Sequence, residues 1–258
     1  MLEKALREFI KENQGNIGVA FKNLDTGETI LINEEMIFPS ASLIKLAIMS
    51  EVMNRVKKGG MTLEDEIMVE AAMMTGGDGI LKELKPGHVF TLEEIITLMI
   101  IVSDNLATNI LIDKIGMESV NRLCQSLGLG ETKLQRKMMD AQARKEGREN
   151  YTCAKDMLAL LELIYRGDNV DGEYSARMLE ILKKQQVTGR LQLYLPEEIT
   201  VAHKTGDLDL LEHDVGIMHL PQCTCILCVL THRTLSNKEG REIIGKIAKL
   251  VYDSYSAP

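Results

Sequence analysis

A serine and a lysine three residues apart, in Ser42-Leu-Ile-Lys45, could together perform nucleophilic catalysis. Residues 42–58 carry apolar side chains at helical spacing, so the hydroxyl and the amine would share one face of a helix. A lysine that has lost its proton could then accept the hydroxyl proton and activate the serine. With 10 Ser and 19 Lys in the chain, about 0.7 such pairs arise by chance, so the pair alone equally fits a capped helix with a solvated lysine.

Two further motifs follow this pair in order along the chain. Ser103-Asp104-Asn105 begins 61 residues after Ser42, and Lys204-Thr205-Gly206 begins 101 residues after Ser103. By composition, about 0.02 and about 0.09 such tripeptides are expected by chance, and the joint chance of all three motifs is about one in a thousand. The first tripeptide interrupts a helical region, and the second is predicted to end a strand. The three motifs therefore indicate one shared site.

Turn signals and apolar spacing predict the elements that position these motifs. A hairpin is expected where the alternating segments 16–25 and 28–33 meet at Asp25-Thr26-Gly27. The capping box Thr91-Leu-Glu-Glu94 begins a helix, and strand character returns only near residue 200. Further helices are predicted over 1–13, 42–58, 152–166, 175–186 and 238–255, and strands over 200–204, 214–220 and 224–231.

Strands at both ends of the chain with helices between them predict an α/β fold of the α+β kind. One antiparallel sheet would be built from both termini and flanked by the terminal helices, with an all-helical subdomain docked against it. We assign residues 1–41 and 191–258 to the α/β subdomain and 42–190 to the helical subdomain. The polar, aperiodic segment 129–150 is long enough to be an Ω-loop. The groove between the subdomains is the expected site.

The composition excludes several classes of function. Lys and Arg total 30 against 38 Asp and Glu, a net charge of −8, so the chain lacks the basic surface that nucleic acid or anionic lipid requires. The longest nearly apolar run, residues 95–102, is too short to span a membrane. Five cysteines, an odd number, favour a reducing compartment, and residues 1–13 lack the apolar stretch of an export signal. We expect a cytoplasmic monomer, or an extracytoplasmic protein if an export signal has been removed.

Three weaker patterns favour structural roles. Cys223, Cys225 and Cys228 cannot converge on a metal, because a strand directs the third to the opposite face, and buried thiols are expected. His213-Asp214 is expected at a strand start, in a turn or edge-strand role. Gly76-Gly77-Asp78-Gly79 lacks the Lys-Ser/Thr that follows a phosphate loop, so a flexible groove wall is expected. No metal site and no cofactor is predicted.

Together the motifs resemble those of the penicillin-recognising serine hydrolases, specifically the class A β-lactamases and their D,D-peptidase-like relatives. Phe38-Pro-Ser-Ala-Ser-Leu-Ile-Lys45 is similar to the nucleophile segment of that family, and the intervals between the motifs are similar as well. The resemblance covers nearly the whole chain and implies the β-lactamase/transpeptidase-like fold. It also implies a hydrolase that forms an acyl-enzyme on a serine, with a small-molecule β-lactam or a D-Ala-D-Ala-like amide as substrate.

The resemblance implies a role for four residues of the first two motifs. Ser42 would attack the carbonyl, and Lys45 in its neutral form would accept the hydroxyl proton. Burial and the nearby charge of Lys204 would lower the pKa of Lys45, as a neutral base requires. Ser103 would relay a proton to the leaving nitrogen, and Asn105 would hold the side-chain amide of the substrate and the structure around Lys45.

The third motif is assigned to substrate binding by the same resemblance. Lys204 and Thr205 would bind the substrate carboxylate, and Gly206 would let the backbone approach closely. The backbone amides of Ser42 and Asp207 would form the oxyanion hole, where one donor is typically worth about 3 to 4 kcal/mol of barrier.

The Ω-loop departs from the family pattern. Class A β-lactamases carry Arg-x-Glu there, and the Glu positions the water that hydrolyses the acyl-enzyme, whereas Arg136-Lys-Met138 puts Met138 at the Glu position. A thioether cannot accept that proton. Asp140, Glu146 and Glu149 would each need a shifted loop to replace it, and we interpret them as solvated loop charges.

Slow deacylation of β-lactams is therefore expected, as in the D,D-peptidase-like relatives. Two alternatives remain. One is a D,D-carboxypeptidase/transpeptidase-like peptidase or an esterase that acts on a non-lactam substrate, and the other is a non-catalytic, ligand-binding relative.

Overall fold

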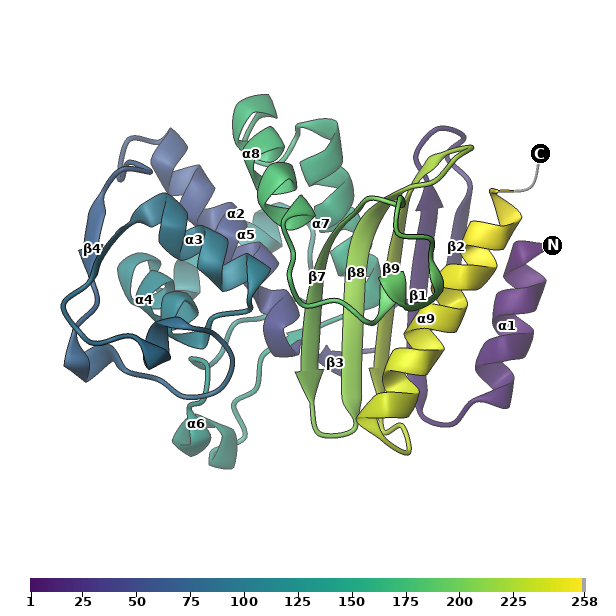
Figure 1. Cartoon of the computed structure of the whole chain (residues 1–258), viewed down its shortest axis with the longest axis horizontal. Coiled ribbons are helices and arrows are strands. Elements are labelled where there is room, and N and C mark those ends of the chain that lie inside the picture. The colour runs from purple at the N-terminus through teal and green to yellow at the C-terminus, as the bar shows by residue number, and fades with distance from the viewer. Residues whose placement is uncertain (257–258) are drawn as a thin grey trace.

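A five-stranded antiparallel sheet occupies one side of the computed structural model, which describes residues 1–256 (Figure 1). The strand order is β2-β1-β9-β8-β7, so two strands from the start of the chain pair with three from its end. This confirms the predicted sheet built from both termini. The strands are β1 (Asn16–Asn23), β2 (Thr29–Ile32), β7 (Val201–Leu208), β8 (Leu211–His219) and β9 (Thr224–His232).

The sheet is buried on both faces, which the alternation of side chains along β9 illustrates. Cys225 and Leu227 point into the core shared with the terminal helices, whereas Ile226 and Cys228 point into the core shared with the helical part. The terminal helices are α1 (Leu2–Glu12) and α9 (Asn237–Ser254), which lie against one face (Figure 1). Helix α7 (Ala154–Arg166) packs on the other face.

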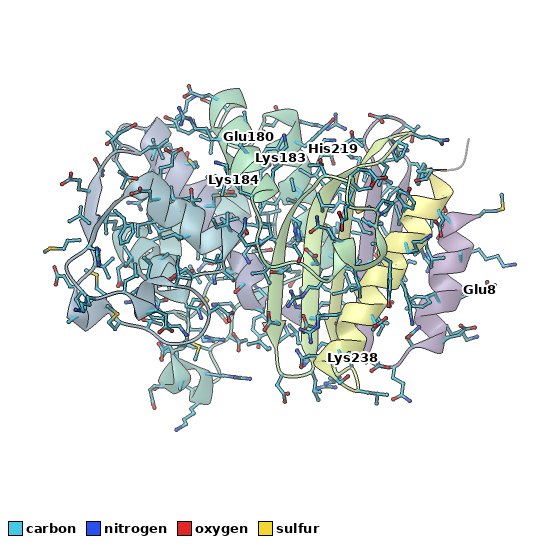
Figure 2. The ribbon with its side chains drawn as sticks, viewed as in Figure 1. Glu8, Glu180, Lys183, Lys184, His219 and Lys238 are labelled. Carbon is cyan, nitrogen blue, oxygen red and sulfur yellow. The ribbon has the colours of Figure 1, made fainter. Side chains whose placement is uncertain are left out.

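The cysteines take the structural role that the sequence predicted. All five thiols are free and buried, and the Cys225 and Cys228 side chains lie on opposite faces of β9. Charged side chains occupy the outer surfaces of the helices instead, as Glu8 on α1 and Lys238 on α9 do in Figure 2.

Helix α2 (Ile44–Lys57) is the centre of the helical part. Every residue from Ile44 to Met53 is buried, because helices pack around α2 on all sides. Its neighbours are α3 (Leu92–Ile101), α4 (Asn105–Ile115), α5 (Met117–Ser126) and α8 (Gly172–Lys183). The predicted capping box at the start of α3 is confirmed: Thr91 accepts from the Glu94 amide, and the Glu94 carboxylate accepts from the Thr91 amide.

Residues 42–190 also contain strands, so this segment is not all helix as predicted. Strand β4 (Glu66–Met68) pairs with β5 (Val89–Thr91), and β6 (Tyr151–Thr152) pairs with β3 (Phe38–Pro39). Strands of two or three residues are too short for alternation to reveal them in a sequence. Short helical turns complete the fold: η1 (Ala41–Leu43), η2 (Ala71–Met73), η3 (Leu81–Glu83), α6 (Ala141–Lys145) and η4 (Leu191–Tyr194).

Two predictions about the strands near the site are wrong. Lys204-Thr205-Gly206 lies inside β7, which continues to Leu208, rather than at its end. His213 and Asp214 lie in β8, which β7 and β9 flank, rather than in a turn or at an edge. Within residues 1–256, no helix combines the length and the apolar character needed to cross a membrane.

Candidate active site

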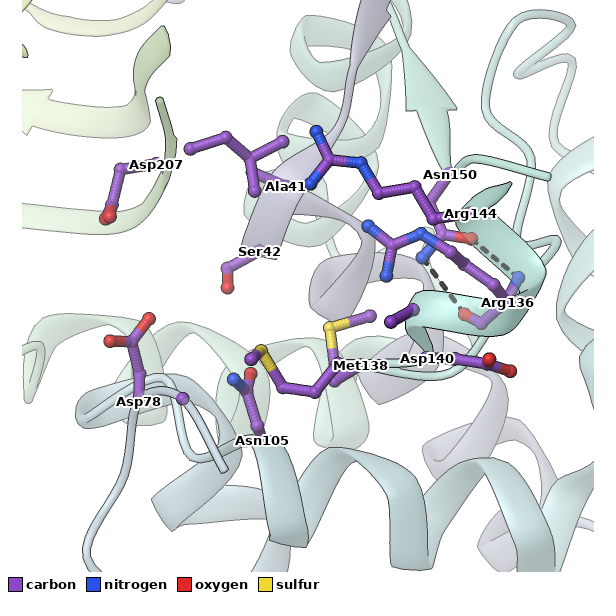
Figure 3. Close-up of a pocket in the computed structure, with 14 residues that line it drawn as sticks. Ala41, Ser42, Asp78, Asn105, Arg136, Met138, Asp140, Arg144, Asn150 and Asp207 are labelled. Atoms are coloured by element: carbon purple, nitrogen blue, oxygen red, sulfur yellow. Dashed lines mark hydrogen bonds between the residues drawn. The ribbon is translucent and has the colours of Figure 1, made fainter. Parts of the chain in front are cut away.

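Ser42 lies in the η1 turn, directly before α2, at the wall of a cavity of about 310 Å³. The cavity opens between three parts of the chain: the end of β7, the segment 77–78 with the first residue of α4, and the Ω-loop (Figure 3). Ala41 and Ser103 both hold left-handed backbone conformations, with φ of 46° and 54°. Such conformations cost about 1 to 3 kcal/mol each in non-glycine residues and concentrate at functional sites. Here they set the direction of the two motif serines.

Lys45 is completely buried and joins the first two motifs. Its Nζ donates to the Ser103 carbonyl oxygen at 2.8 Å, to Ser103 Oγ at 3.0 Å and to Asn105 Oδ1 at 2.9 Å. Burial and then the charge of Lys204 lower the pKa of Lys45 well below its ordinary value. A lysine that has lost its proton is thereby favoured, and the Ser103 hydroxyl can then donate to the nitrogen lone pair.

The direct contact that we expected between Lys45 and Ser42 is not formed. Among the described residues, the Ser42 hydroxyl has no hydrogen-bond partner, because Nζ of Lys45 is directed to Ser103 and Asn105. Ser42 belongs to the tighter η1 turn rather than to α2, so the pair does not share the face of a regular α-helix.

Lys204 brings the third motif to Ser103, the serine that Lys45 also contacts. Its Nζ donates to Ser103 Oγ at 3.1 Å and to the Thr205 carbonyl oxygen at 2.7 Å. Burial, followed by the charge of Arg190, lowers the pKa of Lys204 to about 7. The Ser103 hydroxyl thus lies between two buried amines with lowered pKa values, an arrangement that can pass a proton in either direction.

Gly206 brings β7 against the turn that carries Ser42. A Cβ added at Gly206 would lie 3.0 Å from the Ser42 amide nitrogen and 3.3 Å from the Leu43 amide nitrogen. The segments that carry the two predicted oxyanion donors, Ser42 and Asp207, are therefore in contact. The Asp207 carboxylate pairs with Arg190 at 2.9 Å, and this arginine also binds buried Glu212 at 2.6 Å.

The glycine-rich segment 76–79 forms part of the cavity wall, as predicted, and the start of α4 contacts it. Gly77 and Asp78 line the cavity. The Asp104 carboxylate caps α4 through the Ala107 amide and accepts from the Ile80 and Leu81 amides, each at 2.8 Å. A Cβ at Gly79 would lie 2.3 Å from that carboxylate, so this close approach requires glycine.

The Ω-loop is closed at its base by buried polar contacts. Arg136 and Glu149 form an ion pair at 2.7 Å, and their side chains are only 10% and 12% exposed. The Asn150 amide side chain accepts from the Arg136 amide and donates to its carbonyl oxygen. The interpretation of Glu149 as a solvated charge is therefore wrong, because this carboxylate balances Arg136 inside the loop.

Met138 lines the cavity, and its side chain is directed into it (Figure 3). Its amide donates to Asn109 Oδ1 at 2.8 Å, and Asn109 Nδ2 donates to its carbonyl oxygen at 3.1 Å. The other two loop carboxylates are committed elsewhere: Asp140 caps α6 through the Ala143 amide at 2.9 Å, and Glu146 is exposed and pairs with Arg148.

Sequence reasoning missed Asn109 and Arg190. Asn109 follows Asn105 by four residues on α4, so both amides lie on one helix face, and this spacing is a signal that could have found it. Arg190 carries no local signal, because its partners lie 17 and 22 residues further along the chain. His213 is not a base: it is buried, its ring contacts the Pro39 carbonyl oxygen at 2.9 Å, and burial lowers its pKa to about 4.

Two buried lysines with lowered pKa values, a serine that bridges them and a second serine at the cavity wall lie between a sheet and a helical part, as a serine hydrolase of the β-lactamase kind requires. The model of the beta-lactamase enzyme family matches residues 1–255. The chain belongs to this family, as a class A β-lactamase-like serine hydrolase.

Individual relatives agree with this assignment. The crystal structure of a β-lactamase from Sphaerobacter thermophilus is 32% identical, covers 98% of this chain and 96% of its own, and has a TM-score of 0.91. β-Lactamase VEB-1 of Pseudomonas aeruginosa is 26% identical over 97% of this chain and 89% of its own. A leucine-to-glutamate mutant of PBP-A, solved as an acyl-enzyme complex with penicillin G, is 26% identical, covers 98% and 96% of the two chains, and has a TM-score of 0.89.

Proposed function

We propose that Ser42 forms an acyl-enzyme with β-lactams and that water releases this acyl-enzyme slowly. In the acylation step, the bond between Ser42 Oγ and the lactam carbonyl carbon forms as the lactam C–N bond breaks. The hydroxyl proton passes to neutral Lys45, whose Nζ must turn from Asn105 toward Ser42 for this transfer. Ser103 gives its own proton to the leaving nitrogen and regains one from Lys45, so the site returns to its starting protonation state.

The hydrogen bonds around Ser103 support this relay. Its Oγ lies 3.0 Å from Nζ of Lys45 and 3.1 Å from Nζ of Lys204, so one hydroxyl contacts both amines. In its charged form Lys204 would also attract the substrate carboxylate, together with Thr205. The contacts among these groups argue against a non-catalytic, ligand-binding module, which would need none of them.

Met138 is the observation that carries the second half of the proposal. It lines the cavity beside Ser42 at the position where a class A β-lactamase is expected to hold its water-activating glutamate. The thioether cannot accept a proton from water, and the Ω-loop carboxylates are held by Arg136, by the start of α6 and by Arg148. Hydrolysis then lacks general-base help, which is worth about 10²- to 10⁴-fold in rate.

A D,D-peptidase-like activity on D-Ala-D-Ala-like amides is the second candidate, and Met138 favours it as well. An acyl-enzyme that water attacks slowly survives long enough to be transferred to an amine, which is a better nucleophile than water. A non-lactam ester or peptide could be cleaved by the same acyl transfer.

A chromogenic cephalosporin tests the proposed function. Stopped-flow mixing of the wild-type protein with excess cephalosporin should give a burst of colour equal in amount to the enzyme, followed by a slow steady phase. Fast steady turnover without a burst would refute slow deacylation and direct attention to Asp140 or Glu146 as the base. No reaction at all would refute acylation by β-lactams.

A further inference from the structure

The Ω-loop side of the cavity carries a cation that is only weakly paired. Arg144 lies on α6, lines the cavity, and its side chain is 64% exposed. Its one ion-pair partner within residues 1–256 is Glu149, at 3.8 Å between Nε and Oε2. That carboxylate is already bound by Arg136 at 2.7 Å and by the Asn150 amide at 2.8 Å. Two guanidinium groups thus share one carboxylate, and Arg144 is the less closely paired of the two.

Arg144 is also directed toward the nucleophile. Figure 3 shows the Arg136 and Arg144 side chains running from the Ω-loop toward Ala41 and Ser42. The Asp140 carboxylate points away from Ser42 in the same view, toward the start of α6, where it caps the helix. Arg144 is therefore directed toward Ser42, whereas the carboxylate of Asp140, which also lines the cavity, is directed away from Ser42.

The remaining carboxylates of the cavity act on other groups. Asp207 pairs with Arg190 at 2.9 Å. Asp78 lies across the cavity from the Ω-loop, and its charge raises the pKa values of Lys45 and Lys204, opposing the larger effect of burial. Asp78 thus faces the lysines, and Arg144 is the weakly paired cation on the Ω-loop side of the cavity.

The orientation of a bound substrate decides which part of the substrate lies near Arg144. In the proposed function, the ring carboxylate is held by Lys204, and the leaving nitrogen faces Ser103. Ser103 and Lys204 are not among the residues that line the cavity. The acyl side chain is then left to fill the open space beyond Asn105, which Met138, Met139 and Arg144 bound.

We propose that Arg144 selects substrates whose acyl side chain carries an anionic group, such as a carboxylate. This inference rests on the proposed function and adds the substrate class to it. Because Arg144 is exposed, its attraction for the carboxylate is weak, in the range of surface ion pairs, which corresponds to about three- to fivefold in acylation rate. Salt screens such a contact, so raising the ionic strength from about 0.05 M to about 0.5 M should reduce the preference.

Two penicillins of similar size and opposite side-chain charge provide the probe. α-Carboxybenzylpenicillin and α-aminobenzylpenicillin differ at one substituent, and benzylpenicillin carries neither. The second-order acylation rate of each is measured by intact mass after rapid quenching. The wild-type protein should react faster with the carboxy compound than with the amino compound.

Replacement of Arg144 with glutamine should reduce the ratio of the two rates about three- to fivefold. Arg144→Lys, which keeps the charge, should largely restore the ratio. Lys145→Gln is the matched control, because it removes the same charge from the next residue of α6, which is exposed and outside the cavity lining. This control should leave the ratio unchanged.

The outcomes separate the two proposals. Failure of all three penicillins to form an adduct overturns the proposed function and this inference together. Adducts with all three, at rates that Arg144→Gln changes equally or not at all, overturn only the selection by Arg144. A ratio that falls as much in Lys145→Gln as in Arg144→Gln also overturns it, because the effect would then come from net charge.

Discussion

Replacing Met138 with glutamate should speed hydrolysis of the acyl-enzyme and leave its formation unchanged. The two hydrogen bonds from Asn109, at 2.8 and 3.1 Å, fix the backbone of residue 138, so the new side chain would start from the same point. Glutamate and methionine reach a similar distance from Cα. Met138→Glu would therefore bring a carboxylate into the cavity beside Ser42, where water must attack the acyl group.

The increase in the rate of acyl-enzyme hydrolysis depends on how well that carboxylate is positioned next to the attacking water. General-base help to water is worth up to about 10⁴-fold when the base is well positioned. A misplacement of about 1 Å costs about 10²-fold. Because the native residue is a methionine, the surroundings of residue 138 are not arranged to orient a glutamate carboxylate. We therefore expect the slow phase of cephalosporin turnover to rise about 10²-fold.

The assay reads formation and hydrolysis of the acyl-enzyme separately. Burst amplitude and burst rate report acylation, and the slow phase reports deacylation. Met138→Gln is the control, because it has nearly the shape of the glutamate variant but cannot accept the proton. An unchanged slow phase in Met138→Glu with the burst intact would refute the assignment of residue 138, as would an equal acceleration in Met138→Gln.

Three further predictions follow from the lysines and from the base of the Ω-loop. Lys45→Met should abolish the burst at neutral pH while the far-UV circular dichroism stays unchanged; an unchanged burst would remove Lys45 from the mechanism. The pKa of Lys204 is about 7, so the acylation rate should fall as pH rises through about 7 and the charged partner of the substrate carboxylate is lost. Lys204→Arg keeps its charge to a pKa above about 12 and should extend the plateau to higher pH, whereas an identical pH profile would contradict this role. Arg136→Ala removes the close partner of the Glu149 side chain, which is only 12% exposed, and should cost about 3 kcal/mol in urea unfolding. Lys137→Ala, at a side chain that is 38% exposed, should cost about 0.5 kcal/mol. Equal losses would show that the Ω-loop pair is not stabilising.

The sequence was most informative where function depends on short motifs. The three motifs could be found because each is a run of a few residues, and the main strands and helices because their apolar spacing is long enough to measure. The end of β7 was misjudged because Gly206 and Asp207 are typical of turns, whereas here the glycine lets the strand pass close to Ser42.

Contacts between distant residues could not be predicted from the sequence. The Ω-loop conformation depends on Asn109, which lies 29 residues before Met138, and on the ion pair that buries Glu149. The sequence predicts a solvated charge at Glu149 because its partner, Arg136, lies 13 residues earlier and no local pattern links the two residues. The lowered pKa of Lys45 follows from complete burial, which the spacing of apolar residues in the sequence indicates only indirectly.

Intact mass spectrometry after brief exposure to benzylpenicillin tests the central claim most directly. The wild-type protein should gain the mass of one penicillin, the adduct should map to the peptide that contains Ser42, and it should persist over many minutes. Ser42→Ala should gain nothing under the same conditions. An equal gain in Ser42→Ala, or an adduct on a different residue of the wild type, would contradict the assignment of Ser42 as the nucleophile.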